Sequence, residues 1–235
     1  MASFLTGNPS SAGQLLMSSS STPFHDLGEK MFTDDGRAFR YAKAGGVALV
    51  PGTLLQAAAE DTSDQNLAVA AAAIGATSIA TTTTVTVTAN QYQYVMVTVT
   101  PGQGYMYKIK SHPAATAAAL TITLEDALQV ALTTSSRIDL VASPYNGVVI
   151  NPSTATSAPV GVAVYPIAIG EYGWIQTSGP TCLLADGTVT VGTTLVASNA
   201  TAGAVEAFTG VQAVVGEAMT GIATTEYGAV NLMLQ

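Results

Sequence analysis

Adjacent carboxylates are the side chains of this sequence that come nearest to a hydrolytic site. They occur at Asp34-Asp35, Glu60-Asp61 and Glu125-Asp126. General acid–base catalysis requires carboxyl groups that converge on one substrate. Neighbouring residues of a strand point to opposite faces, however, and acidic pairs in loops are usually solvated. We therefore expect no catalytic residue among these pairs, and we expect that the chain is not an enzyme.

The other residues with reactive or metal-binding side chains are one cysteine, Cys182, and two histidines, His25 and His112. A cysteine nucleophile requires a partner base, and neither histidine lies in a recognisable motif. The sequence has no Cys pair, no His pair at helical spacing and no calcium-loop motif, so we expect no metal and no cofactor. Because Cys182 lies between Thr181 and Leu183 on a predicted strand, we interpret it as a small buried side chain.

Two further features have a structural and a functional interpretation. Gly102-Gln103-Gly104 could cradle a phosphate, but no helix follows to offer its N-terminal amides, so we interpret it as a hairpin tip. Trp174 could stack on a sugar, but an alternating strand normally buries such a ring. We therefore expect Trp174 in the core.

An internal repeat is the most specific pattern in the chain. Residues 160–173 and 215–228 align without a gap and share Val-Gly-x-Ala, Ile-Ala and Glu-Tyr-Gly at the same positions. Chance rarely preserves such a combination, so the pattern predicts a repeated supersecondary unit. Glu171 and Glu226 recur in it, which favours a repeated structural corner over catalysis.

The first copy runs into a longer stretch, Tyr172–Leu195, that we interpret as strand, turn and strand. In order, this stretch contains a predicted break at Gly179-Pro180, apolar Leu183-Leu184, a tight turn at Asp186-Gly187 and an alternating strand over 188–191. Many such short runs between Gly, Pro and Asn turns predict an all-β fold of small barrels or sandwiches.

We expect four segments along the chain. They are an extended N-terminal arm, 1–28; N-terminal strands, 29–66, which could pack on the C-terminal barrel; a β domain, 67–135; and a C-terminal β-barrel, 136–235, with both repeat copies. The most apolar stretch, 67–80, is too short and too rich in Ala to span a bilayer, so we expect no membrane association.

The charge distribution argues against nucleic-acid binding. The net charge is −8, only 9% of residues are charged, and no Lys or Arg follows Arg137. A protein that neutralises phosphates needs a basic face. The basic residues cluster near the start, and we interpret this cluster either as a solvated strand face or as a docking surface for a negative partner. They are Lys30, Arg37, Arg40 and Lys43.

Residues 1–28 are rich in Ser, Gly, Pro and Thr and cannot bury a core of their own. They form either a disordered tail or an arm that becomes ordered against a neighbouring protein. In the second interpretation, the apolar side chains of the arm are its anchors. These partner-binding candidates are Phe4, Leu5, Leu15, Leu16 and Phe24.

With these segments in view, the chain resembles structural head proteins of tailed bacteriophages, and most closely their capsid decoration, or cement, proteins. The segments that carry this resemblance are Asp35–Leu54, Gly104–Pro113, Pro144–Ile150, Tyr172–Pro180, Asp186-Gly187 and Val215–Ala218.

The resemblance implies a β-rich homotrimer on the virion, made in the host cytoplasm and seated on the major capsid protein. It also implies an arm that stiffens the shell, and no catalytic residue, metal or small-molecule substrate. A carbohydrate-binding or adhesive β module is the alternative function. A shell-forming capsid subunit is a third interpretation, but it requires a long spine helix that no apolar 3.6-residue period predicts here.

Overall fold

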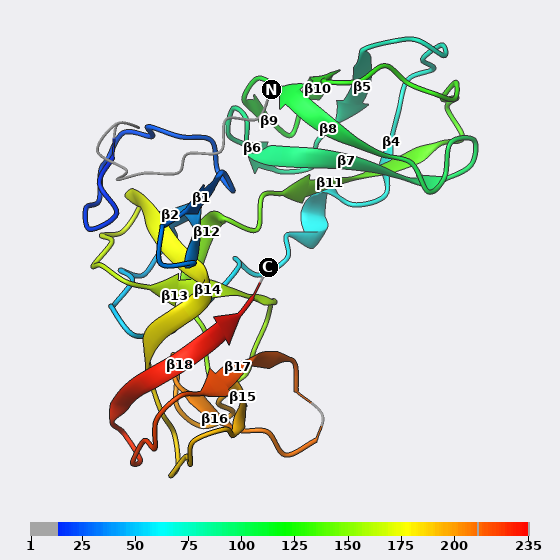
Figure 1. Cartoon of the computed structure of the whole chain (residues 1–235). Helices are drawn as coiled ribbons and strands as arrows, with labels where there is room; N and C mark the ends of the chain where they lie inside the picture. The colour runs from blue at the N-terminus through cyan, green and yellow to red at the C-terminus, as the bar shows by residue number, and fades with distance from the viewer. Residues whose placement is uncertain (1–13, 211, 235) are drawn as a thin grey trace. The chain divides into compact units, whose positions relative to one another are not determined.

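Runs rich in threonine and valine form strands throughout the chain, because branching at Cβ suits an extended, pleated backbone. The computed structural model describes residues 14–210 and 212–234. Strands make up 46% of the structure and helix makes up 1%. The predicted all-β fold is therefore confirmed. The chain divides into unit 1, Met1–Glu60 with Pro144–Gln235, and unit 2, Asp61–Ser143 (Figure 1).

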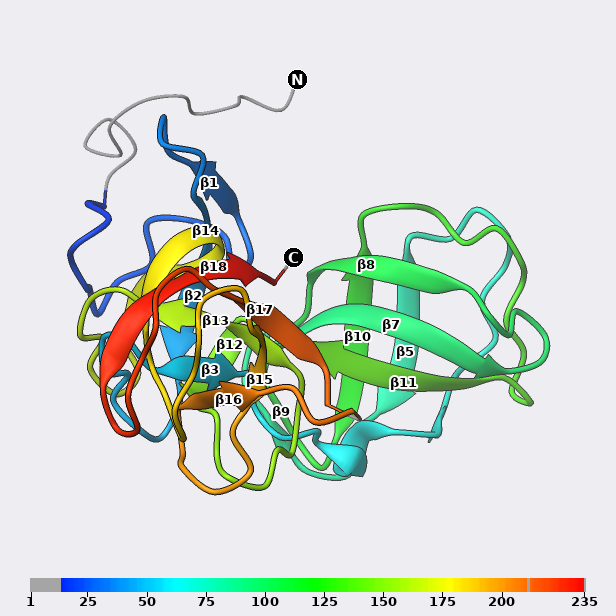
Figure 2. The ribbon, with the colours of Figure 1, turned by 60° about the horizontal axis from the view of Figure 1, so that its bottom comes forward.

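Unit 1 is built from two barrels that share one long strand. Its strands are β1 (Lys30–Phe32), β2 (Ala38–Ala44), β3 (Leu54–Gln56), β12 (Asn146–Ile150), β13 (Pro159–Ala163), β14 (Tyr172–Leu184), β15 (Thr194–Ala197), β16 (Val205–Ala207), β17 (Val214–Ala218) and β18 (Tyr227–Met233). Barrel 1 is the ring β2-β12-β3-β13-β14, closed because β14 also pairs with β2. Barrel 2 is the ring β14-β18-β17-β15-β16, closed by a parallel bridge between Ala185 and Val205 (Figure 2).

The strand β14 belongs to both barrels. Its residues 172–178 pair with β2 in barrel 1, and its residues 178–184 pair with β18 in barrel 2. The predicted break at Gly179-Pro180 is therefore wrong. The backbone of Gly179, with φ of +85°, changes direction there without ending the strand.

One side chain satisfies the carbonyl groups around this change of direction. The Gln176 side chain is fully buried, and its Nε2 donates to the carbonyl oxygens of Ser178, Gly179 and Pro180 at 3.0, 3.2 and 2.8 Å. The three bonds link residues on both sides of Gly179, so this amide supports a continuous strand where the pattern of glycine and proline predicts an interruption.

The two barrels repeat each other residue for residue. In barrel 1, β13 pairs with β14 at Val162–Gln176, and in barrel 2, β17 pairs with β18 at Glu217–Asn231. The correspondence extends to the β3–β13 and β15–β17 pairs and to the bridges Leu49–Ile167 and Val189–Ile222. The internal repeat seen in the sequence is thus the visible part of a duplicated barrel.

Glycines of the repeat lie where backbones approach closely. A Cβ on Gly161 would lie 2.9 Å from the Gln176 carbonyl oxygen, and a Cβ on Gly216 would overlap the corresponding Asn231 carbonyl oxygen. Likewise, a Cβ on Gly173 would lie 2.6 Å from the Ile167 Cδ1 atom. The recurring Val-Gly and Tyr-Gly pairs therefore reflect packing between adjacent strands.

Unit 2 is a separate closed sheet with its own core. Its strands are β4 (Leu67–Ala68), β5 (Ser78–Thr82), β6 (Thr86–Val87), β7 (Tyr92–Val99), β8 (Met106–Ser111), β9 (Ala115–Thr116), β10 (Ala119–Leu124) and β11 (Arg137–Ala142). The order β4-β11-β7-β8-β10-β5 is closed by a bridge between Val69 and Thr81. A short 3-10 helix, η2 (Thr62–Asp64), precedes β4.

Unit 2 is inserted into one loop of barrel 1. It separates β3 from β12, whereas the corresponding strands β15 and β16 of barrel 2 are joined by residues 198–204 alone. One expected boundary is wrong. The strand Arg137–Ala142, which we assigned to the C-terminal barrel, pairs with β7 in unit 2, because its Ile138 and Leu140 fill the unit 2 core.

The remaining local predictions have mixed outcomes. The turn at Asp186-Gly187 is confirmed, with φ of +83° at Gly187, and the hairpin tip at Gly102-Gln103-Gly104 lies between β7 and β8. The predicted strand over 188–191 is reduced to a single bridge at Val189.

Replacing Gly216 with Ala should destabilise unit 1 by roughly 1–3 kcal/mol, because the added methyl group meets a backbone carbonyl that cannot move aside. Urea unfolding followed by circular dichroism measures this change. Gly221→Ala is the matched control, because its nearest contact would be the Val189 carbonyl oxygen at 3.7 Å. Equal stability of the two variants would contradict the close-approach argument.

Replacing residues 59–143 with a short Gly-Ser linker should leave unit 1 folded. The side chain of Ala58 lies 3.5 Å from the Cβ position of Gly147, so a short linker spans the gap. Shortening a loop changes its closure entropy only slightly, so we expect the unfolding free energy of unit 1 to change by less than about 2 kcal/mol. Loss of cooperative unfolding, monitored by Trp174 fluorescence, would contradict this.

Candidate functional site

The N-terminal segment, defined here as Gln14–Gly28, lies along the outside of barrel 1. The Ser20 backbone pairs with Tyr172 through bonds of 3.0 and 2.8 Å. The buried Gln14 side chain donates to the Tyr172 carbonyl oxygen at 3.0 Å and accepts from the Tyr41 hydroxyl. The segment is therefore attached to barrel 1 by hydrogen bonds at its start and middle.

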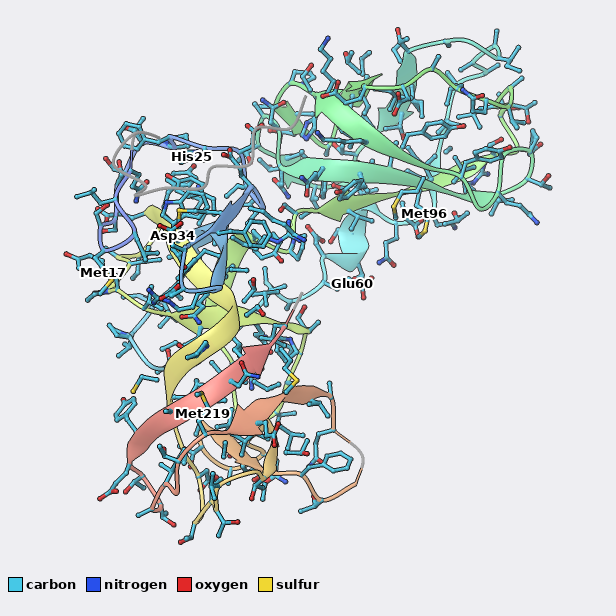
Figure 3. The ribbon with its side chains drawn as sticks, in the orientation of Figure 1. Met17, His25, Asp34, Glu60, Met96 and Met219 are labelled. Carbon is cyan, nitrogen blue, oxygen red and sulfur yellow. The ribbon has the colours of Figure 1, made fainter. Side chains whose placement is uncertain are left out.

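The apolar side chains of this segment divide between two sides. Leu16 packs on the outer face of barrel 1, and Leu27 packs against its interior cluster. Leu15, Met17 and Phe24 are exposed, with exposed fractions of 53, 58 and 53%. Figure 3 labels Met17 at the edge of the molecule. The segment therefore presents an apolar outer side on a fixed backbone.

The predicted partner-binding residues have different locations. Leu15 and Phe24 are on the exposed side, whereas Leu16 contacts its own barrel. Phe4 and Leu5 lie outside the described residues.

An aromatic layer lies between the N-terminal segment and barrel 1. Met31, Phe39, Tyr41 and Trp174 are buried in it, so the prediction of a core Trp174 is confirmed. The His25 ring lies 4.9 Å from the Trp174 ring and its Nδ1 is 3.1 Å from a Glu29 carboxylate oxygen.

The basic cluster lies over aromatic rings of its own barrel. Arg37, Arg40 and Lys43 lie over Phe39, Tyr145 and Tyr172 at 5.4, 5.5 and 5.4 Å respectively. Cation–π contacts of this kind hold the charged groups against the protein surface. The arrangement favours the interpretation as a strand face over a docking surface for an anionic partner.

Two of the three acidic pairs contain a carboxylate with a local structural role, and the third pair is exposed. Asp35 accepts from the Thr33 hydroxyl and from Arg37 Nε, and the Thr33 bond is the main cause that lowers its carboxyl pKa. Asp61 caps the helix η2 by accepting from the Ser63 amide at 2.9 Å. Glu125 and its neighbour are exposed at the end of β10.

The two repeated glutamates occupy equivalent corners. The amides of Glu171 and Glu226 donate to the carbonyl oxygens three residues earlier, and their own carbonyl oxygens accept from Ala44 and Ala185. The side chain of Glu171 also accepts from the Ser19 hydroxyl of the N-terminal segment. The interpretation as a structural corner is confirmed by these bonds.

Unit 2 contains a buried polar network that the sequence analysis did not identify. The Tyr92 hydroxyl donates to Asp64 Oδ2 at 2.6 Å, and the Tyr92 amide donates to His112 Nε2 at 3.1 Å. His112 Nδ1 lies 2.9 Å from the Pro113 carbonyl oxygen, which fixes the tautomer with the proton on Nδ1. The exposed fractions of Asp64, Tyr92 and His112 are only 0, 4 and 3%.

This network is internally satisfied, because the Asp64 carboxylate also accepts from the Thr84 amide. It therefore joins η2 to the sheet of unit 2 and leaves no group directed at a substrate. In the sequence, Asp64 belongs to an acidic loop and its partners Thr84 and Tyr92 are 20 and 28 residues later, so no local pattern marks it.

The prediction of a buried Cys182 is wrong. Its side chain is exposed, because Leu183 takes the inward position of β14 and alternation turns Cys182 outward. Among the described residues no group of three or more His, Cys, Asp or Glu side chains could hold a metal ion. In the same residues no helix is long and apolar enough to cross a membrane.

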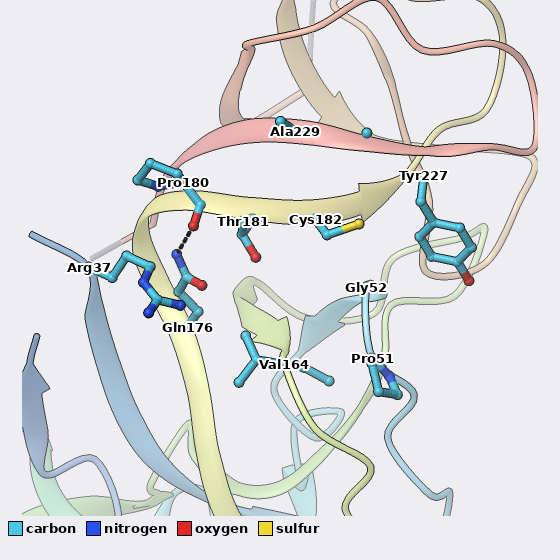
Figure 4. Close-up of a pocket in the computed structure, with 12 residues that line it drawn as sticks. Arg37, Pro51, Gly52, Val164, Gln176, Pro180, Thr181, Cys182, Tyr227 and Ala229 are labelled. Atoms are coloured by element: carbon cyan, nitrogen blue, oxygen red, sulfur yellow. Dashed lines mark hydrogen bonds between the residues drawn. The ribbon is translucent and has the colours of Figure 1, made fainter. Parts of the chain in front are cut away.

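Cys182 lies on a groove of about 600 Å³ where β14 passes from barrel 1 to barrel 2 (Figure 4). The groove lies between Pro180 and Cys182 on one side and Gly52 and Val164 on the other. Figure 4 shows Gln176 at one end of it and Tyr227 at the other.

Comparison with known proteins gives no significant match to a protein-family model, a curated protein or a solved structure.

The free energy of unfolding of unit 2 should fall as the pH rises above about 10. Burial, followed by the bond to Asp64, raises the pKa of Tyr92 above its ordinary value of 10.0. The unfolded chain then loses this proton before the folded chain does, so stability present below pH 10 is lost above it. Urea unfolding at pH 8 to 11 measures this.

Tyr92→Phe is the matched variant. It should lose roughly 1–3 kcal/mol at pH 8, because Asp64 stays buried without its donor, and the decline above pH 10 should become shallower. An unchanged pH dependence in this variant would contradict the assignment to Tyr92.

Proposed function

We propose that the chain is a viral structural protein, a decoration protein that binds the outer surface of a tailed-bacteriophage head and stabilises the shell. The observation that carries the proposal is the N-terminal segment with its apolar outer side. Leu15, Met17 and Phe24 are each more than half exposed on a backbone that hydrogen bonds already hold against barrel 1. A fixed apolar strip costs less entropy to bind than a flexible one.

The composition of the surface supports the same role. Only 9% of residues are charged, so a large contact area can be covered without desolvating many ionised groups. Each contact contributes little alone, but a symmetric shell repeats it many times, and linked contacts raise the overall affinity strongly. The proposed partner is the major capsid protein, and the proposed assembly is a homotrimer on the virion.

The closed barrels suit a load-bearing role. Ring closure in both barrels pairs strand edges that would otherwise offer hydrogen-bonding groups to other chains. Contacts through side chains can then be specific, because edge-to-edge association does not compete with them. A rigid body that joins neighbouring shell subunits resists their separation under internal pressure.

The two other interpretations have less support. A carbohydrate-binding module would use exposed aromatic rings along a groove, but Trp174 is 1% exposed and Tyr227 is the aromatic residue that lines the groove described above. A shell-forming subunit would use a spine helix, whereas helix makes up 1% of the described chain.

The triple variant Leu15→Ser, Met17→Ser and Phe24→Ser should fold normally but bind capsids at least about tenfold more weakly, since it loses buried apolar area at the interface. The measurement is co-sedimentation with empty shells of the major capsid protein encoded in the same genome. The solution mass of the purified chain gives its oligomeric state.

The control is Ile169→Ser with Val191→Ser, which removes apolar side chains that are 63 and 69% exposed elsewhere on unit 1. Equal binding by the triple variant and the parent would reject the N-terminal segment as the contact. Absence of co-sedimentation by the parent chain would reject the proposed function itself.

A further inference from the structure

The groove between the barrels exists because the duplicated barrels differ on one face. On the outer face of barrel 1, the pairs Tyr41–Trp174 and Phe39–Gln176 join β2 to β14. The corresponding pairs in barrel 2 are Cys182–Ala229 and Pro180–Asn231. Two aromatic rings that face outward in barrel 1, Tyr41 and Trp174, are therefore replaced by the small side chains of Cys182 and Ala229.

The two barrels also differ in whether other parts of the chain cover this outer face. In barrel 1 the N-terminal segment and β1 bury the aromatic layer completely, with Trp174 and Tyr41 at 1 and 0% exposure. In barrel 2 the same face is open, and Cys182 is exposed there. The missing rings and the missing cover together leave the hollow of about 600 Å³, which is within the range of roughly 300–1,000 Å³ usual for small-molecule sites.

One wall of the groove carries a buried acceptor without a partner. Gln176 is 0% exposed and its Nε2 makes three hydrogen bonds to carbonyl groups, but its Oε1 has no partner. The three bonds prevent the amide from turning to satisfy Oε1 elsewhere. An unpaired buried acceptor is destabilising, and a ligand N–H or O–H group would supply the missing hydrogen bond.

The charge of the groove favours a neutral occupant. Arg37 lies at the same end as Gln176, but its Nε is 2.7 Å from an Asp35 carboxylate oxygen. The guanidinium charge is therefore already balanced. The remaining walls are mainly apolar or small, among them Pro180, Val164 and Ala229.

We propose that this groove binds a small neutral aromatic molecule with one hydrogen-bond donor, of the indole or phenol class. Its ring occupies the space that aromatic side chains fill on the equivalent face of barrel 1. Its N–H or O–H group donates to Gln176 Oε1, which becomes accessible after a small local shift of side chains, because this oxygen is buried in the structure. The site is independent of the proposed capsid function, because it lies between the barrels and not on the N-terminal segment.

Titration calorimetry with indole and with N-methylindole tests the site in the full-length chain. N-methylindole has the same ring system but no donor, so it should bind at least about tenfold more weakly than indole. Indole should also slow alkylation of Cys182 by iodoacetamide, which reports one site because the chain has one cysteine. Absence of indole binding, or equal binding of both compounds, would overturn the proposal.

Ala229→Trp places in barrel 2 the side chain that barrel 1 has at the equivalent position, Trp174, and should abolish indole binding. Ala200→Trp, in an exposed turn of barrel 2, is the control for an added surface ring and should bind as the parent does. If Ala229→Trp does not fold, Cys182→Leu fills the groove less completely and should weaken binding at least fivefold. Unchanged binding in a folded filling variant would also overturn the proposal.

Discussion

The architecture of unit 1 depends on one amide group, that of Gln176. Two barrels can share a strand only if that strand exchanges its partner, from β2 to β18, without interruption. Gly179, with φ of +85°, provides the backbone conformation at this exchange. Gln176 Nε2 donates to the carbonyl oxygens of Ser178, Gly179 and Pro180, which lie on both sides of this exchange. These three bonds tie the half of β14 in barrel 1 to the half in barrel 2, so one buried side chain supports the continuity of the strand.

Ring closure explains how a chain with so few charges can remain a defined structure. Sheet proteins commonly protect their edges with charged residues, but here only 9% of residues are charged. In the described part of unit 1, β2 and β14 instead pair with neighbours on both sides. The glycines Gly161 and Gly216 allow the close approach of strands that this closure requires.

The sequence predicts the strands and the repeat well, because both depend on local patterns. Alternation and turn residues identify β7, β8 and the repeated corners at Glu171 and Glu226. It does not predict the continuity of β14, since glycine and proline normally end a strand and the compensating bonds come from a side chain. It also misplaces Cys182, because alternation gives two faces without saying which is buried. The network of Asp64 joins residues far apart in the chain, and no local pattern encodes such contacts.

The duplicated barrels depart from symmetry at a few features, and both proposed binding sites lie among them. Symmetric positions, such as Ile167 and Ile222, are explained by packing alone, since each fills the same space in its own barrel. Barrel 2 lacks three features of barrel 1: the covering N-terminal segment, unit 2 in place of the short link 198–204, and the outward aromatic rings that small residues replace around the groove. The N-terminal segment covers barrel 1 but still exposes apolar side chains, and the groove leaves a buried acceptor unpaired. A fold under selection for stability alone would remove both costs, and for this reason we propose these asymmetric features as the places where other molecules bind.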